Sequence, residues 1–362
     1  MKVAVIIDTW FPFVGGGQIN AWEISKRLAK RGVKIDIITR NNGKDSLKRV
    51  KNLHVYKLGS KTNPNNTLSK LIFVFRAFVF TYRRNYDLIH AHAFLPGITA
   101  RFQMVFKATP VVFTVHGTSI DTKLNNIFSR WIEKFILTGI LYNAQITVSQ
   151  DFSKLQNVNK RVIYIPNGVD LKKFDKLKAK KFANPTLIFV GRLHPQKNLK
   201  TLISAIVIVK EKIPNVRLLI VGDGEQKKEL QRLARNLKLK ANIRFLGTKT
   251  RSDLVELYES CHAFILPSIY EGQPVTLLEA WAAKLPVVVT QRGDCQFLVK
   301  NGFNGYLIND PKNPQVIANM IIRAFKNKNL DELGENGYNL VKDNFSWEKS
   351  AQQTMEVYTS VI

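Results

Sequence analysis

The chain has 362 residues, of which 45% are hydrophobic, 10% aromatic and 23% charged, and this composition excludes a mainly disordered or fibrous protein. Its 55 Lys and Arg against 27 Asp and Glu give a net charge of +28, which indicates an anionic partner. Two cysteines exclude a disulfide framework, and no apolar run reaches the roughly 18 residues that a membrane-spanning helix needs.

The first half of the chain alternates β-type apolar runs with helical patterns, including a helix at 18–30. This alternation predicts a parallel, doubly wound sheet. The first apolar run is too short for a signal peptide, so we expect a reduced, cytoplasmic setting. The expected strands are 3–7, 33–38, 53–56, 88–91, 111–115, 146–148 and 162–165.

Residues 71–84 form an apolar, aromatic-rich segment with basic edges. Two interpretations remain open, a core helix of the first domain and a helix that docks at a membrane interface. Residues 1–180 hold 30 basic and 10 acidic side chains. Because that field attracts anionic lipid, we expect peripheral contact with an anionic membrane.

A lysine-rich stretch at 166–185 precedes a second alternation of strands and helices. Expected strands are 187–190, 216–221, 243–246, 264–266, 287–290 and 306–308, and expected helices are 199–212, 226–237, 253–260, 275–283 and 314–326. The sequence therefore predicts two doubly wound, Rossmann-like α/β domains facing a central cleft, with binding residues after the carboxyl ends of strands. The expected domains are 1–171 and 172–344.

Two glycine clusters follow expected strands. Gly15, Gly16 and Gly17 precede a helix, where backbone amides can approach a phosphate, although a mobile loop is an alternative. Asn20 stands where a dinucleotide fingerprint has its last glycine, so a nicotinamide or flavin site loses support. Gly222-Asp223-Gly224 is interpreted as a tight structural turn.

Arg192 and Lys197 flank the expected start of a helix that Asn198 would cap. Two cations beside the positive end of a helix repel it unless an anion lies between them. A diphosphate would resolve this conflict. The alternative is two solvated basic side chains.

The segment 267–280 holds two carboxylates around another expected helix start. Pro274 suits the first helical position, which would leave the amides of Val275 and Thr276 pointing outward. Glu271 precedes the helix and Glu279 lies inside it. One carboxylate could therefore accept hydrogen bonds from the hydroxyls of a sugar, and the other from those of a ribose. The alternatives are an acid that favours the dipole and a solvated acid.

With His116-Gly117, these motifs resemble the retaining nucleotide-sugar glycosyltransferases of family four, which have the two-Rossmann GT-B architecture. The resemblance covers essentially the whole chain. It implies that Arg192 and Lys197 neutralise the donor diphosphate and that Glu271 and His116 contact the transferred sugar. It also implies that Glu279 binds the ribose. Further donor contacts would come from Gly16, Gly17, Gly272, Gln273, Val275 and Thr276.

The resemblance also implies retention of anomeric configuration, a UDP- or GDP-sugar as donor, and no cofactor. No Asp-x-Asp motif occurs, so we expect no metal and assign its role to the two cations. Relatives commonly have Phe-Gly where this chain has Gln273-Pro274, which leaves the sugar in doubt. The segment 345–362 resembles the family's carboxyl-terminal helix, which crosses back to the first domain.

The expected acceptor is a glycan or a lipid-linked precursor at the inner face of the membrane. We expect no nucleic-acid partner, because no binding motif for nucleic acid is present. An epimerase or phosphorylase with the same architecture remains an alternative, and so does a basic nucleic-acid-binding protein. Turnover of the donor without an acceptor would favour the epimerase or phosphorylase.

Overall fold

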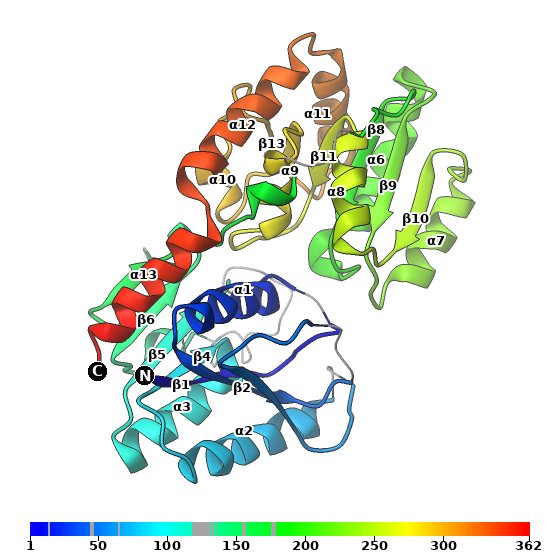
Figure 1. Ribbon diagram of the computed structural model, residues 1–362. Coiled ribbons are helices and arrows are strands. Elements are labelled where there is room, and N and C mark those ends of the chain that lie inside the picture. The colour runs from blue at the N-terminus through cyan, green and yellow to red at the C-terminus, as the bar shows by residue number, and fades with distance from the viewer. Residues whose placement is uncertain are drawn as a thin grey trace. The chain divides into compact units, whose positions relative to one another are not determined.

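The computed structural model describes residues 1–362 apart from 14, 44–46, 64–65, 118–130, 132–133, 136, 154–156 and 175–178. The chain divides into two compact units (Figure 1). Unit 1 comprises Met1–Gly168 with Trp347–Ile362, and unit 2 comprises Val169–Ser346. Part of the lysine-rich stretch at 166–185, namely 175–178, lies outside the described residues.

Unit 1 is built on a seven-stranded parallel sheet with the order β3-β2-β1-β4-β5-β6-β7. All seven expected strands of the first half are present, with ends shifted by a few residues at most. The order reverses between β1 and β4, and ligands of open α/β sheets bind at such a switch point. The strands are β1 Lys2–Ile7, β2 Lys34–Arg40, β3 Leu53–Leu58, β4 Leu88–His92, β5 Val111–Val115, β6 Ala144–Thr147 and β7 Val162–Tyr164.

Helices cover both faces of this sheet (Figure 1). α1 packs against α13 on one face, and α2 packs against α3 on the other. The strand faces toward α2 and α3 bury Ile6, Ile89 and Phe113 in a hydrophobic core, which is the main stabilising contribution. The helices are α1 Gly16–Lys30, α2 Thr67–Tyr82, α3 Phe94–Lys107, α5 Gln150–Ser153 and α13 Trp347–Thr359.

Unit 2 has a six-stranded parallel sheet with the order β10-β9-β8-β11-β12-β13, which reverses between β8 and β11. Its strands are β8 Thr186–Val190, β9 Arg217–Val221, β10 Ile243–Gly247, β11 Ala263–Leu266, β12 Val287–Thr290 and β13 Tyr306–Ile308. Its α-helices are α6 Leu199–Lys212, α7 Lys227–Asn236, α8 Arg251–Ser260, α9 Val275–Ala282, α10 Cys295–Leu298, α11 Pro314–Lys326 and α12 Leu330–Asn344. The predicted doubly wound α/β fold class is confirmed in both halves.

The turn after β9 is structural, as the sequence predicts. Gly222 has φ of +132°, a conformation that side chains rarely adopt. A Cβ at Gly222 would collide with the carbonyl oxygen of Gly191, and one at Gly224 would collide with Leu193. These two glycines therefore let the β9 turn pack against the loop after β8.

The apolar segment at 71–84 forms most of α2, which has a buried side and an exposed side. Phe73, Ala77 and Thr81 are buried, whereas Leu71 and Phe75 are 60% and 67% exposed. α2 is thus a core helix on one side only. None of the helices in the described part of the chain has the length and apolarity to cross a membrane.

Candidate functional site

The residues predicted from unit 2 gather at the switch point of its sheet. Gly191 and Arg192 follow β8, and a short 3₁₀ helix, Pro195–Lys197, precedes α6. The segment containing Glu271 follows β11, the neighbouring strand. Arg192 is exposed, and the structure gives its guanidinium no acidic partner within the described residues.

Lys197 and Glu271 form an ion pair, with 2.6 Å between Nζ and Oε1. Ser268 donates to the same carboxylate oxygen at 2.5 Å, and Glu271 is only 5% exposed. A carboxylate so buried requires compensation of its charge. The sequence predicted Lys197 at the donor diphosphate and Glu271 at the transferred sugar, and it did not predict this direct pairing.

Asn198 lies at the predicted N-cap position of α6 but does not cap the helix with its side chain. It adopts the left-handed conformation with φ of +57°, and its side chain makes no capping hydrogen bond to α6. Its amide nitrogen instead donates to the carbonyl oxygens of Pro267, at 3.1 Å, and Pro311, at 2.5 Å. Asn198 therefore ties the loop after β8 to the loop after β11, which fixes Lys197 beside Glu271.

The start of α9 also differs by one residue from the prediction. Pro274 lies at the N-cap rather than at the first helical position, and the helix begins at Val275. The first amides of a helix lack a carbonyl partner one turn earlier, so Val275 and Thr276 still present donors beside Glu271. This is an arrangement suited to a phosphate.

Glu279 lies one turn further along α9. The hydroxyl of Tyr258 donates to its Oε2 at 3.3 Å, and it also lies 3.4 Å from the carbonyl oxygen of Thr276. Tyr258 is fully buried, so it holds the carboxylate from the core side. Gln273 is also buried, whereas Gly272 is half-buried.

Sequence reasoning missed Gly293, which follows β12. Its φ is +59°, and a Cβ there would collide with the carbonyl oxygen of Glu271. The amide of Asp294 donates to that oxygen at 3.3 Å. The sequence signal that could have identified Gly293 was a glycine shortly after an expected strand. Gly293 lets the loop after β12 pack against the backbone of Glu271.

Replacing Gly293 with alanine should therefore destabilise unit 2 more than the same change at Gly302. Both glycines have positive φ, but a Cβ at Gly302 meets nothing within 4 Å. We expect about 1 kcal/mol for Gly302→Ala from backbone strain and at least about 2 kcal/mol more for Gly293→Ala from the collision. Urea unfolding measures both, and equal losses would contradict the role given to Gly293.

In unit 1, the predicted residues meet at the switch point between β1 and β4. A Cβ at Gly17, on the first turn of α1, would lie 3.2 Å from the ring of His116. His116 follows β5 and shares a hydrogen bond of 2.8 Å, from its Nε2 to Nδ1 of His92 at the end of β4. Sequence reasoning missed His92, although its position at a strand end was a signal. Gly16 begins α1, and a Cβ there would meet nothing within 4 Å.

The other ring nitrogen of His116, Nδ1, is buried and has no hydrogen-bond partner among the residues that the structure describes. Burial lowers the pKa of His116 to about 4. It also lowers the pKa of His90, on the same strand face as His92, to about 3. His116 is thus neutral at pH 7.

Acidification should destabilise unit 1 through these histidines. His116 binds a proton near pH 6.5 in the unfolded chain but only near pH 4 in the folded chain. Its contribution to the free energy of unfolding is therefore fully present above pH 6.5 and is lost as the pH falls toward 4. Each histidine contributes up to about 1.4 kcal/mol per pH unit. Urea unfolding of wild type and His116→Asn at several pH values tests this. Identical pH slopes would contradict it.

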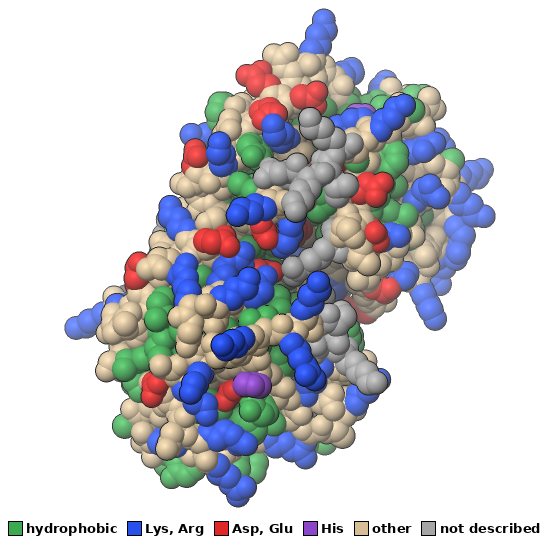
Figure 2. Space-filling model, in the orientation of Figure 1, with side chains coloured by type: hydrophobic (Ala, Val, Ile, Leu, Met, Phe, Trp, Pro, Cys, Tyr) green, Lys and Arg blue, Asp and Glu red, His purple; other side chains and the backbone are tan. Residues whose placement is uncertain are grey.

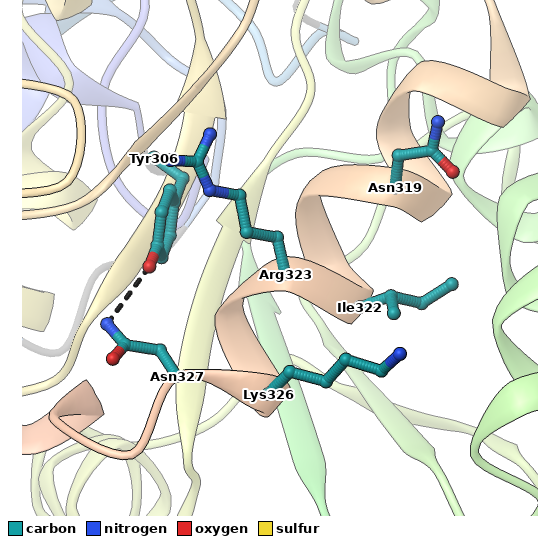
Figure 3. A pocket seen from close by; sticks show the side chains of 6 residues that line it. All are labelled: Tyr306, Asn319, Ile322, Arg323, Lys326 and Asn327. Carbon is teal, nitrogen blue, oxygen red and sulfur yellow. Dashed lines mark hydrogen bonds between the residues drawn. The ribbon is translucent and has the colours of Figure 1, made fainter.

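A cavity on unit 2 is a separate feature (Figure 3). It has a volume of about 580 Å³ and lies between β13 and α11, where Arg323 and Tyr306 form one wall. Tyr306 is the first residue of β13, so this cavity lies at the amino end of a strand. Ligands of parallel sheets bind at the opposite edge, and no predicted site residue lines it.

Comparison with known proteins agrees with this geometry. Residues 172–340 match the family described as Glycosyl transferases group 1, and residues 14–173 match Glycosyltransferase Family 4. The UDP-Gal:alpha-D-GlcNAc-diphosphoundecaprenol alpha-1,3-galactosyltransferase of Escherichia coli is 29% identical over 77% of each chain. The N-acetyl-alpha-D-glucosaminyl L-malate synthase of Bacillus anthracis is 25% identical over 100% of this chain and 98% of its own.

Solved structures share the fold along the whole length. Sucrose-phosphate synthase from Thermosynechococcus elongatus has a TM-score of 0.86 at 22% identity, covering 99% of this chain and 98% of its own. HepE of Anabaena, solved with UDP and glucose, has a TM-score of 0.81 at 20% identity, covering 99% and 100%. These neighbours confirm the predicted GT-B fold class. Because the two family matches together span residues 14–340, the chain belongs to the group 1, family 4 glycosyltransferases.

Proposed function

We propose that this glycosyltransferase moves a hexosyl sugar from a UDP-sugar to a hydroxyl acceptor, with retention of anomeric configuration and without a metal. The observation that carries the proposal is the cluster at the switch point of unit 2. There, Arg192 follows β8, Lys197 pairs with Glu271, and α9, which carries Glu279, begins four residues after Glu271. Cations and helix amides suit a diphosphate, and carboxylates accept hydrogen bonds from sugar hydroxyls.

Relatives favour uridine over guanosine for the donor. HepE was solved with UDP and with UDP-glucose, and the name of the E. coli relative contains UDP-Gal. The buried Gln273 stands beside the amides of α9. We assign Gln273 and Gly272 to the transferred sugar, together with His116 and the glycines that begin α1.

In the proposed reaction, the bond between the sugar C1 and the diphosphate oxygen breaks and the diphosphate leaves. Arg192, Lys197 and the α9 amides stabilise the charge that develops on it. The acceptor oxygen then bonds to C1 on the face that the diphosphate leaves, and its proton passes to a phosphate oxygen. Glu271 is engaged by Lys197 and Ser268, so we assign it a binding role and no covalent bond to the sugar.

Two measurements test the proposal. A thermal-shift panel of UDP-, GDP- and ADP-sugars should show the largest stabilisation with a UDP-sugar, because a ligand that binds the folded state raises its stability. Product analysis by NMR should then show the donor's anomeric configuration in the product. An inverted product would exclude the same-face reaction, and donor turnover without acceptor would favour an epimerase or phosphorylase.

We further propose that the acceptor is lipid-linked and that unit 1 binds an anionic membrane through α2 and α3. The E. coli relative acts on a diphosphoundecaprenol, as its name states. Neither helix contains Asp or Glu, and Phe78 bridges them by ring contacts of 5.9 Å to Phe102 and Phe106. Exposed apolar side chains on the two helices are Leu68, Leu71, Ile72, Phe75, Tyr82, Phe102, Val105 and Phe106.

Basic side chains accompany this apolar surface. Arg83 follows α2, and Lys107 ends α3, where its ammonium donates to the carbonyl oxygen of Tyr82 at 2.9 Å. In Figure 2, apolar and basic side chains lie next to one another on the unit that carries these helices. Apolar side chains can enter the lipid while cations meet headgroups.

Sedimentation with vesicles tests the membrane proposal. We expect binding to vesicles that contain phosphatidylglycerol, weaker binding at high salt because charge is screened, and little binding to neutral vesicles. Phe75→Ser with Phe106→Ser should reduce binding, whereas Phe303→Ser, an exposed aromatic of unit 2, serves as the matched control. Binding that ignores salt and the α2–α3 variants would contradict the proposal.

A further inference from the structure

A second cavity lies in unit 1 between the ends of two strands and the first half of α2. Its volume is about 180 Å³. Two of its lining residues, Arg40 and Leu58, are the last residues of β2 and β3. It therefore lies at the carboxyl edge of the sheet, where α/β domains bind ligands.

Among the residues that the structure describes, the polar wall of this cavity contains two arginines and no acid. Arg40 is 1% exposed, and its guanidinium binds both carboxylate oxygens of Asp8, at 2.7 Å and 3.1 Å. It also lies 3.3 Å from the hydroxyl of Ser69. Because Asp8 balances its charge, Arg40 serves mainly to hold this wall in place. Ser60, Thr62 and Asn66 supply further polar groups.

Arg76 is the other arginine of this wall. It is exposed, and the structure pairs it with no acidic side chain in the described part of unit 1. Its guanidinium lies over Gly59, which has φ of +83°, and any side chain at Gly59 would collide with Nη1. A guanidinium with its N–H groups available, next to hydroxyls, is suited to bind a phosphate group in two-pronged fashion.

An apolar track begins at the rim of the same cavity. Leu68 and Ile72 line it, and together with Leu71 and Phe75 they form one face of α2 at the spacing i, i+3, i+4 and i+7. All four are exposed, from 41% for Ile72 to 67% for Leu68 and Phe75. A free phosphate would use only the polar wall, whereas an amphiphile would use both features.

We propose that this cavity binds the phosphate or diphosphate group of a polyprenyl-linked acceptor, and that the polyprenyl chain lies along the exposed face of α2. Arg76 supplies the charge that the phosphate needs, and Leu68, Leu71, Ile72 and Phe75 contact the chain. The role of this ligand as an acceptor rests on the proposed function, but its binding to the cavity can be measured without sugar transfer. It names Arg76 as a residue that determines acceptor affinity.

Calorimetric titration with farnesyl diphosphate tests the proposal, in the presence of saturating UDP so that the diphosphate site of unit 2 is filled. Wild type should bind farnesyl diphosphate at least about tenfold more tightly than inorganic pyrophosphate, since chain burial adds to affinity. Equal affinity for the two would overturn the assignment of α2 to the lipid chain. Repeating the titration with Arg192→Ala and Lys197→Ala in the same chain separates the two sites.

Variants of α2 complete the test. Arg76→Gln should weaken farnesyl diphosphate binding about tenfold or more, as loss of a charge-assisted contact predicts. Arg49→Gln should not weaken it, because Arg49 is an exposed arginine of unit 1 that does not line the cavity. Phe75→Ser should weaken the binding of farnesyl diphosphate and leave the binding of pyrophosphate unchanged. Unchanged binding by Arg76→Gln would overturn the proposal. Loss of sugar transfer with retained Arg76-dependent binding would instead count against the proposed function alone.

Discussion

Replacing both Arg192 and Lys197 with alanine should abolish measurable sugar transfer. In the proposed mechanism, these two side chains supply the positive charge that stabilises the leaving diphosphate. Loss of one preorganised donor commonly costs about 10²–10³-fold in kcat, so we expect at least about 10³-fold from the pair. Initial-rate kinetics measures the loss, and UDP titration should show weakened binding.

A matched control comes from Lys200, which lies three residues after Lys197 on α6. It is exposed and pairs with Glu229 at 2.6 Å, so Lys200→Ala removes a nearby charge without touching the site. Lys197→Ala leaves the buried Glu271 without its cation, so thermal unfolding of each variant must accompany the kinetics. Full activity in a folded double variant would remove the basis of the proposed function.

Glu271→Gln and Glu279→Gln should affect different kinetic constants. Glu271 holds Lys197 in place, so its neutral isostere should lower kcat by about 10²-fold through the leaving group and the transferred sugar. Glu279 is assigned to the ribose, which binds alike in the ground and transition states. Its replacement should raise the donor KM about tenfold with little change in kcat.

Steady-state kinetics with varied donor concentration separates these outcomes. Tyr258 keeps a second acceptor, the carbonyl oxygen of Thr276 at 3.4 Å, when Glu279 is neutralised, so a large loss of stability is not expected. Identical effects of the two variants on kcat and KM would contradict the separate roles. A normal kcat for Glu271→Gln would place Glu271 outside the reacting region.

The fold was accessible from the sequence because its signals are local. Strands such as Val111–Val115 and Val287–Thr290 are mainly apolar runs, as is typical of strands buried on both faces. Each is followed by glycine or polar residues within a few positions. The doubly wound topology then follows from the alternation with helices, and binding residues are expected at strand ends.

The contacts within the site were less accessible, because they join residues far apart in the sequence. Lys197 and Glu271 are 74 residues apart, and neither residue type alone specifies the other as a partner. Asn198 suited a helix cap by composition, but its side chain found carbonyl acceptors at Pro267 and Pro311. At Asn198, tertiary hydrogen bonds rather than local helix-capping propensity determine the position of the side chain.

By itself, the sequence determined the two α/β halves, the strand ends that carry the candidate residues, and the resemblance that the family matches confirm. Apolar periodicity and turn residues encode those features within short windows. Only the tertiary structure decided which side of α2 is buried, that Arg76 lies over Gly59, and that His92 contacts His116. Such decisions depend on packing between distant elements, where burial and hydrogen-bond geometry select among the partners that sequence alone leaves equivalent.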